Sequence, residues 1–429
     1  MWSDRLPPED LRLLVNQILS VVPPASIEQW ESPSPASQSE PGFAWFNGLP
    51  LSKPLAIATY SNGEGVVSGP KGSVRLHARG FDLLEALLTA WHGAPALLAG
   101  FLSYDLAAEL EDLGPAPPES FQFPQLHFGL YKNAPAHQPE EELAPIFASC
   151  PVTSRPSRAC FEAAVERIVA AIHAGDFFQT NLCRSLETCL QPGSEWALFQ
   201  RLRRINPARY EAFLRIDVRR AVLSVSPETF LKVKNGVVES SPIKGTRPRG
   251  RAADEDAALA RELLASEKDR AELAMIVDVT RNDLGRVCET GSVEVIQHAA
   301  LMSLPTVHHL FSTVRGKLRP SSGLVDLLRA AFPAASITGA PKIEAMRAAL
   351  REEGQWRGPC MGAIGWISLG RADSMELSVA IRTAFVSEGR VRYYAGCGIT
   401  ADSIPASEFA ESRHKAAAFV SVLDRQDDP

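Results

Sequence analysis

Hydrophobic positions recur at helical spacing in the segment that follows residue 157. Phe161, Val165, Ile168 and Ile172 are separated by three or four residues, and the pattern ends before Gly175. Side chains at this spacing share one face of an α-helix, and glycine commonly follows a helix end. The segment therefore predicts an amphipathic helix.

Shorter runs of apolar and β-branched residues predict strands between turn signals. In the first part of the chain they cover 55–60 and 96–100, and later they cover 177–186, 210–218, 221–225, 292–301, 307–318, 362–369, 377–386 and 390–394. Asn235-Gly236 separates 229–234 from 237–239 and predicts a type I′ hairpin, because both residues accept positive φ angles. Strand pairs with intervening helices predict an α+β fold with mainly antiparallel sheets and outer helices.

The pattern divides the chain into two regions. Residues 1–154 are rich in proline and weakly periodic, whereas residues 155–425 carry sharper signals, including helices at about 268–278, 342–353 and from 405. We predict an N-terminal region of the fold followed by a catalytic region.

Composition narrows the class of protein. The 429 residues are 45% hydrophobic and carry a net charge of −6, which gives no electrostatic case for nucleic-acid binding. No apolar run approaches the roughly 18 residues of a membrane span, and Met1–Pro8 lacks the features of a signal peptide. We therefore expect a cytoplasmic protein without a membrane partner. Seven cysteines without metal-ligand spacing argue against a disulfide framework or a zinc site.

The sequence PIKGT at 242–246 is the first candidate for chemistry. It follows the hairpin and predicts a tight turn that presents the Lys244 amine to a pocket. A lysine is a nucleophile only when it is neutral, so a burying pocket or a nearby cation would have to lower its pKa. The alternative is a solvated loop lysine, which is the commoner fate of a single lysine.

Two pairs of acidic residues lie three positions apart on predicted helices. Asp269 and Glu272 form one pair, and Glu408 and Glu411 form the other. Brought together, the pairs would make an all-oxygen site suited to Mg²⁺. Taken singly, each pair is typical of a charged outer helix face.

Six motifs in one order resemble the chorismate-utilising enzymes. They are PIKGT at 242–246, DVTRNDLGR at 278–286, VHHL at 307–310, SITGAPK at 336–342, IRT at 381–383 and AGCGI at 395–399. The resemblance runs from about residue 156 to residue 423. It implies an α/β sandwich in which both regions share one core.

Two positions are informative within that family. Anthranilate synthases usually have alanine where Lys244 stands, whereas the branch that aminates chorismate at C4 has lysine. Isochorismate and salicylate synthases carry a water-activating lysine in a segment where this chain has Gln179, which cannot serve as a base. The resemblance therefore implies the C4-aminating branch, with anthranilate synthase component I as the alternative enzyme and a non-catalytic chorismate-binding subunit as the alternative class.

The resemblance also implies roles for individual residues. Glu272 and Glu411 would bind Mg²⁺ directly, and Asp269 and Glu408 would hold its waters. The substrate-binding residues would be Arg382 and the amides of Gly396 and Gly398, which would grip a carboxylate, together with Thr246 and Lys415, which would line the pocket. Alternatives are a structural ion pair for Arg382, tight-turn glycines, a turn hydroxyl and a helix salt-bridge partner.

Three residues would act in the reaction itself. Lys244 would attack C2 of chorismate, Glu228 would protonate the hydroxyl that leaves C4, and His309 would support the ring. Alone, Glu228 would be interpreted as an exposed strand-end carboxylate and His309 as a structural histidine. Cys360 stands where the family usually has a tyrosine, which removes one expected carboxylate contact.

Ammonia is the second substrate in this interpretation, and a partner would supply it. Cys397 is flanked by Ala395 and Ile399 instead of the glycines of a Gly-x-Cys-x-Gly nucleophile elbow. The sequence therefore predicts that a separate glutamine amidotransferase subunit releases ammonia from glutamine.

Overall fold

The computed structural model describes residues 6–30, 39–47, 49–51, 53–115, 117, 123–132, 150–191, 193–370, 372 and 374–424. The local predictions at the hairpin and the first helix are confirmed. Asn235 and Gly236 have φ angles of 52° and 77° and join two strands. The helix after residue 157 is capped by Ser157, whose side chain accepts a hydrogen bond from the Cys160 amide, and it ends at Gly175 with φ 89°.

The described strands form two large sheets, and all their pairings are antiparallel. The twelve-stranded sheet has the order β14 (Ile243–Pro248), β16 (Val307–Lys317), β13 (Val237–Ser241), β12 (Thr229–Lys234), β19 (Ser374–Val379), β18 (Ala363–Ser368), β6 (Ala96–Leu102), β7 (Leu126–Lys132), β3 (Ala56–Ser61), β4 (Glu64–Gly69) and β5 (Gly72–His77), with β15 (Glu294–Ser303) paired to β16.

The nine-stranded sheet has the order β17 (Gly339–Ala340), β9 (Gln179–Cys189), β21 (Arg390–Ile399), β20 (Thr383–Ser387), β11 (Arg220–Ser226), β10 (Tyr210–Arg215), β1 (Ala44–Phe46) and β2 (Leu49–Pro50), with β8 (Thr153–Arg155) paired to β9.

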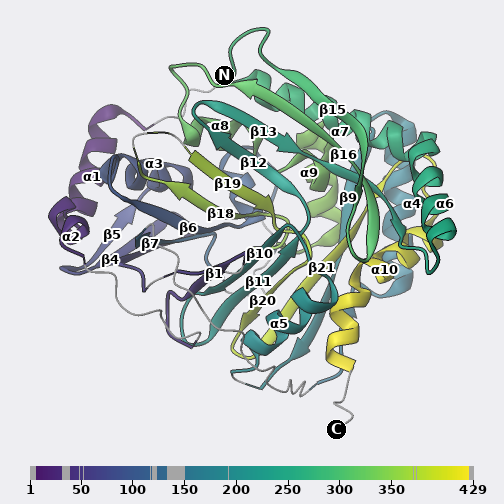
Figure 1. The fold of residues 1–429 in the computed structure, drawn as a ribbon, viewed down its shortest axis with the longest axis horizontal. Coiled ribbons are helices and arrows are strands. Elements are labelled where there is room, and N and C mark those ends of the chain that lie inside the picture. Colours follow the sequence, from purple (N-terminus) through teal and green to yellow (C-terminus); the bar gives the residue numbers. More distant parts are fainter. Residues whose placement is uncertain are drawn as a thin grey trace.

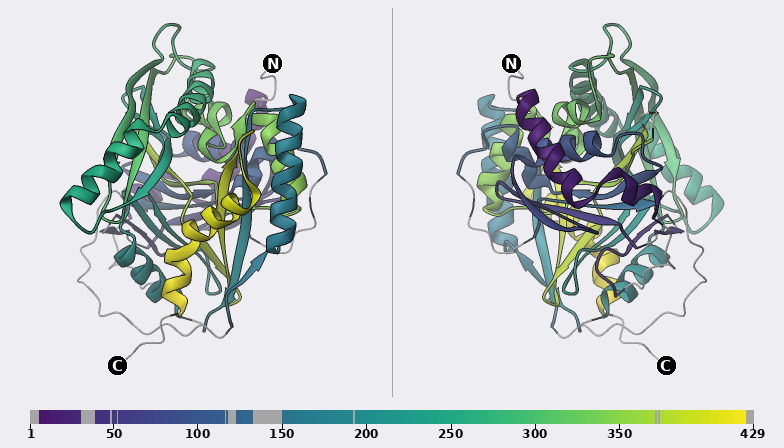
Figure 2. Two further views of the ribbon diagram at one scale, coloured as in Figure 1. Left: turned by 90° about the vertical axis from the view of Figure 1, so that its right-hand side faces the viewer. Right: turned by 90° about the vertical axis from the view of Figure 1, so that its left-hand side faces the viewer.

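Helices surround this pair of sheets. They are α1 (Pro8–Val21), α2 (Pro24–Glu28), α3 (Gly80–Ala90), α4 (Arg158–Ala174), α5 (Glu195–Ile205), α6 (Ala253–Ala265), α7 (Glu267–Gly285), α8 (Leu324–Ala331), α9 (Lys342–Glu353) and α10 (Pro405–Asp424), with 3₁₀ turns η1 (Tyr104–Glu109) and η2 (Ala335–Ile337). Helices α1 to α3 lie at one side of the molecule, and α4, α6 and α10 lie at the opposite side (Figure 1). Helices α4 and α10 run beside each other over β21 and β9 (Figure 2).

One hydrophobic core lies between the sheets and draws on both regions of the chain. It includes Phe101 from β6, Leu377 from β19 and Phe385 from β20, all of which are buried. Strand β6 also pairs directly with β18, so strands from before and after residue 154 share one sheet. The predicted α+β sandwich is thus confirmed, while the boundary at residue 154 stays a prediction.

The prediction of one strand at 377–386 was wrong. The chain leaves the twelve-stranded sheet after β19 and enters the nine-stranded sheet at β20, and Arg382 between them has a φ of 49°. A second crossover joins the same two sheets. It lies between β11 and β12 and consists of residues 227 and 228. The two crossovers are hydrogen bonded to each other, from the Val225 amide to the Arg382 carbonyl (3.2 Å) and from the Val379 amide to the Glu228 carbonyl (3.1 Å).

The predicted tight turn at 242–246 was also wrong. Lys244 lies on β14, which pairs with β16, and the register shifts between Lys244 and Thr246. Gly245 at this irregularity has a φ of 70°, a conformation that glycine adopts at little cost. The bulge therefore replaces the turn that the glycine indicated.

In the part of the chain that the structure describes, no helix is long and apolar enough to cross a membrane. The first five residues of the predicted signal-free N-terminus lie outside the described ranges.

Candidate active site

Lys244 projects from β14 toward α7 and meets a carboxylate there. Its Nζ atom is 2.7 Å from Glu272 Oε1, and the Gln179 side-chain amide donates to the same oxygen at 2.5 Å. The Lys244 and Glu272 side chains are only 11% and 16% exposed, so Lys244 is not a solvated loop lysine. The amine is thus the ion-pair partner of a carboxylate in this arrangement. It must lose a proton before it can attack carbon.

Gly398 on β21 lies directly against the side chains of Lys244, Glu272 and Gln179. A Cβ atom at this position would overlap both Gln179 Nε2 and Glu272 Oε1 and would lie 3.3 Å from Lys244 Nζ. The three side chains therefore converge over a strand position where any larger residue would force the ends of Gln179 and Glu272 to shift. The pairing of β21 with β20 ends at Tyr393, so the strand has no described β20 partner beside Gly396 and Gly398. Binding of an anion by the backbone amides of these glycines stays a prediction.

Glu228 lies on the crossover between β11 and β12 and is 3% exposed. Burial raises the pKa of Glu228 to about 7, against the opposing attraction of Lys244 and Lys415. The side chain is therefore not the exposed strand-end carboxylate of the alternative interpretation. A carboxyl group with a pKa near neutrality can donate a proton and recover it, which is what general acid catalysis requires.

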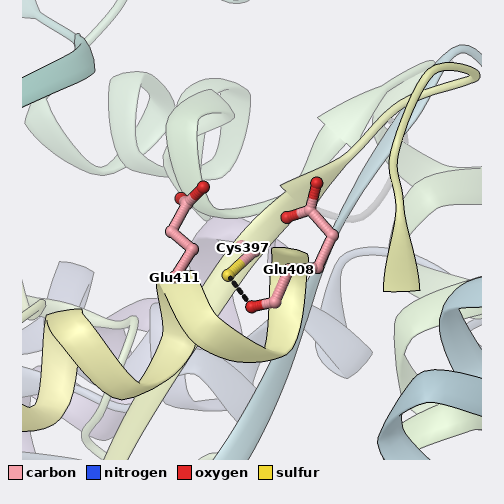
Figure 3. A group of neighbouring side chains, drawn as sticks. All are labelled: Cys397, Glu408 and Glu411. Atoms are coloured by element: carbon pink, nitrogen blue, oxygen red, sulfur yellow. Dashed lines mark hydrogen bonds between the residues drawn. The ribbon is translucent and has the colours of Figure 1, made fainter. Parts of the chain in front are cut away.

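The second acidic pair faces the same space from α10. The carboxylates of Glu408 and Glu411 point away from the helix on the same side, next to Cys397 of β21 (Figure 3). The Cys397 thiol donates to the Glu408 backbone carbonyl (3.2 Å), and Ser403 Oγ donates to Glu408 Oε1 (2.7 Å). Burial, followed by repulsion from Glu411, raises the pKa of Glu408. The two carboxylates are therefore close enough to disfavour each other's charge.

Lys244 and Lys415 act electrostatically on both acidic pairs. Lys415 Nζ is 2.8 Å from Glu411 Oε1 and 3.0 Å from the Gly396 carbonyl oxygen. Burial opposes ionisation of Glu272, but attraction to Lys244 and Lys415 outweighs it and lowers the pKa of Glu272. The Glu411 and Lys415 side chains are 52% and 45% exposed, so this is the open side of the site.

Asp269 lies at the edge of this group. Its carboxylate is 3.3 Å from Arg247 Nη2 of β14 and so has a cationic partner of its own. Among the four acidic residues predicted to form a metal site, Asp269 is thus the one for which the described residues include an arginine partner, and this arginine is half-buried.

Arg382 and His309 form a third group of predicted site residues. Arg382 Nη2 is 3.2 Å from His309 Nε2, and His309 Nδ1 contacts Thr246 Oγ1 (3.0 Å) and the Gly245 carbonyl (3.2 Å). A carbonyl only accepts, so Nδ1 carries the proton and Nε2 accepts from Arg382. Burial, followed by repulsion from Arg382, lowers the pKa of His309 to about 4, which keeps the ring neutral. The histidine therefore links two parts of the chain. One is the β14 bulge next to Lys244, and the other is the crossover that contains Arg382.

Sequence reasoning missed one residue of this group. Asn206 Oδ1 accepts a hydrogen bond from Arg382 Nη1 at 3.0 Å. It directly follows α5, a helix that was not predicted. The Asn206-Pro207 dipeptide is a helix-end signal that could have drawn attention to it. Cys360, where a tyrosine was expected, is buried and donates to the Thr383 carbonyl (3.0 Å).

Comparison with known proteins places this chain in a family. A family model described as chorismate binding enzyme matches residues 38–421. Aminodeoxychorismate synthase component 1 of Klebsiella aerogenes is 38% identical over 76% of this chain and 76% of its own length. Aminodeoxychorismate synthase of Streptomyces griseus is 46% identical over 66% of this chain, but the match spans only 38% of that protein.

Anthranilate synthases are also similar. Component 1 from Streptomyces coelicolor is 34% identical over 90% of this chain and 84% of its own length. The crystal structure of anthranilate synthase component I from Streptococcus pneumoniae superposes with a TM-score of 0.75 at 27% identity, covering 98% of this chain and all of that one.

Proposed function

Because the chain belongs to the chorismate binding enzyme family and acts on chorismate, we propose that it converts chorismate and ammonia to 4-amino-4-deoxychorismate, as an aminodeoxychorismate synthase component I. The observation that carries this choice of product is Lys244. Its amine lies in the site, 2.7 Å from Glu272 and near enough to Glu228 for its attraction to oppose the burial that raises the pKa of that carboxyl group. Anthranilate synthases resemble the chain almost as strongly, but they usually have no amine at this position.

The reaction consists of two displacements in which the ring electrons move in opposite directions. Neutral Lys244 forms a bond to C2, the two ring double bonds shift, and the C4 hydroxyl leaves as water with a proton from Glu228. Ammonia then bonds to C4, the double bonds shift back, and the bond between C2 and Lys244 breaks. One proton of the incoming ammonia is left over, and it restores the proton that Glu228 gave up. Atoms balance as chorismate plus ammonia giving the 4-amino product plus water.

Arg382 supports the binding of a substrate with carboxylates. In the described part of the chain it pairs with no carboxylate, and its contacts are the neutral side chains of Asn206 and His309. A sheltered guanidinium without a counter-ion favours an anionic ligand. The structural ion pair considered for Arg382 is thus not formed.

The acidic residues fit Mg²⁺ by the chemistry of their donor set. Glu272, Glu408 and Glu411 offer carboxylate oxygens that repel one another, and the Cys397 thiol near them is directed to a backbone carbonyl. Glu272 and Glu411 would bind the ion, and Glu408 and Asp269 would hold its waters. When bound, the ion would neutralise a ring carboxylate of chorismate and so fix the ring beside Lys244.

The ammonia comes from a glutamine amidotransferase subunit. The names of the Klebsiella and Streptomyces coelicolor relatives designate them component 1, which implies a second component for those proteins. The product is a precursor of p-aminobenzoate and folate, which is consistent with a cytoplasmic enzyme.

Product analysis tests the proposal. Purified protein is incubated with chorismate, Mg²⁺ and ammonium, and the product is identified by chromatography and mass spectrometry. The proposal requires 4-amino-4-deoxychorismate. Anthranilate would instead establish the second candidate, anthranilate synthase component I, and a protein that binds chorismate without turnover would be a binding subunit.

A further inference from the structure

The Arg382 guanidinium is held at both ends by neutral acceptors. Nη1 donates to Asn206 Oδ1 (3.0 Å), and Nη2 donates to His309 Nε2 (3.2 Å). Two other sheltered arginines of the chain differ: Arg329 pairs with Asp82 and Arg357 with Glu353, each at 2.7 Å. Protein carboxylates therefore neutralise the charges of Arg329 and Arg357. The hydrogen-bond partners of Arg382 are neutral, so they orient its guanidinium without neutralising its charge.

Asn206 is itself fixed by two different elements. Its backbone N–H donates to the Leu202 carbonyl at the end of α5 (3.0 Å). Its Oδ1 atom also accepts from Thr306 Oγ1 (3.3 Å), in the connection between β15 and β16. Because both Arg382 and Thr306 donate to the same atom, that atom is the side-chain oxygen and the orientation of the amide is determined.

The Arg382 backbone is held as firmly as its side chain. The residue has a φ of 49°, and its carbonyl accepts from the Val225 amide at 3.2 Å. A residue of this kind in the left-handed region persists where its surroundings fix it, and such positions gather at functional sites. With the main chain fixed at the crossover, Asn206 and His309 determine where the planar guanidinium points.

We propose that Asn206 is a positioning residue, which aims the Arg382 guanidinium at a carboxylate of chorismate and, being neutral, leaves the full charge to the substrate. The inference rests on the proposed binding of chorismate by Arg382, and it concerns affinity, not the choice between C2 and C4 products. An aspartate of the same shape at position 206 would hold the guanidinium equally well but would pair with its charge.

Two variants test separately whether Asn206 positions the Arg382 guanidinium and whether the neutral charge of Asn206 matters. Asn206→Ala removes one hydrogen bond to a charged group, a loss worth about tenfold to a hundredfold in binding. We expect KM and the calorimetric Kd for chorismate to rise by about that factor, while kcat changes less than about threefold. Asn206→Asp should weaken binding at least as much although it preserves the contact. Asn47→Ala is the matched control, because the side chain of this exposed asparagine accepts from the Glu211 backbone amide and has no hydrogen bond to Arg382 among the described residues.

A double-mutant cycle excludes a merely structural role. Asn206→Ala should cause no further loss of chorismate affinity in an Arg382→Ala background, with the folded state checked by thermal unfolding. Full additivity of the two losses, or unchanged affinity in Asn206→Asp, would overturn the inference. The calorimetry uses chorismate and Mg²⁺ without ammonia, so a different amination product would refute the proposed function and leave this result readable.

Discussion

Glu228 gives the protein a pH-dependent stability that one substitution should remove. The carboxyl group is 3% exposed, and burial raises its pKa from the ordinary 4.5 to about 7. Below pH 4.5 the group is protonated in both the folded and the unfolded chain and contributes no difference. Between pH 4.5 and 7 the unfolded chain loses the proton first, so the free energy of unfolding falls as the pH rises, and above pH 7 the loss is complete.

The size of this effect follows from the two pKa values. At about 1.4 kcal/mol per pH unit, the interval from 4.5 to about 7 corresponds to roughly 3 kcal/mol. Glu228→Gln has nearly the same shape but does not titrate. The variant should therefore match the wild type near pH 4.5 and exceed its free energy of unfolding by up to about 3 kcal/mol at pH 8.

Urea unfolding at pH 5 and pH 8 measures this difference. Glu344→Gln serves as the control, since that carboxylate is 49% exposed and pairs with Arg347 on the surface of α9. Its difference from the wild type should be small at both pH values. If Glu228→Gln kept the wild-type slope between pH 5 and 8, the buried acid would not be the source of the slope and its role as a proton donor would lose its support. Activity adds a second readout: kcat should fall above pH 7 in the wild type, and by about 10²–10⁴-fold in the variant at any pH.

Other predictions test the remaining parts of the site. Lys244→Ala should lose most formation of the 4-amino product, and Lys244→Arg should not restore it, because a guanidinium stays protonated. Undiminished product from the alanine variant would refute the covalent step. An adduct on Lys244, trapped without ammonia, should be seen by peptide mass spectrometry. Glu272→Ala and Glu411→Ala should each abolish Mg²⁺-dependent turnover with little change in melting temperature, and normal turnover in both would refute the metal site. Gly398→Ala should lower activity strongly, because its Cβ would overlap Gln179 and Glu272; unchanged kinetics would show that these side chains are free to move. Ammonium alone should support turnover, whereas glutamine should require an added amidotransferase, and glutamine-dependent activity of the purified chain would contradict this.

Much of the fold could be predicted because its signals are local. Helix periodicity after residue 157, the Asn235-Gly236 turn and the acidic helices at 268 and 405 all depend on neighbours within a few positions. The α+β class followed from the order of these elements. The N-terminal helices α1 and α3 were missed, since their surroundings are proline-rich or contain long apolar runs without clear period.

The site could be predicted as a set of residue types but not as a geometry. Lys244, Glu272 and Gln179 meet because β14, α7 and β9 pack at one end of both sheets, and no spacing in the sequence encodes that meeting. The bulge at Gly245 resembled a turn in sequence, because glycine with positive φ serves both structures.

The least predictable feature carries two of the most important residues. The segment 377–386 reads as one apolar strand, and nothing local marks a break at Arg382. The break arises because Ser378 pairs with Thr229 in one sheet while Thr383 pairs with Ser224 in the other. The chain must therefore change sheets twice at the same level, once before Thr229 and once before Thr383. Since the two crossovers are hydrogen bonded to each other, the segments that carry Glu228 and Arg382 are neighbours, although 154 positions separate these residues in the numbering of the chain. The proposed proton donor and the proposed carboxylate anchor thus lie on two crossovers that are held together by backbone hydrogen bonds.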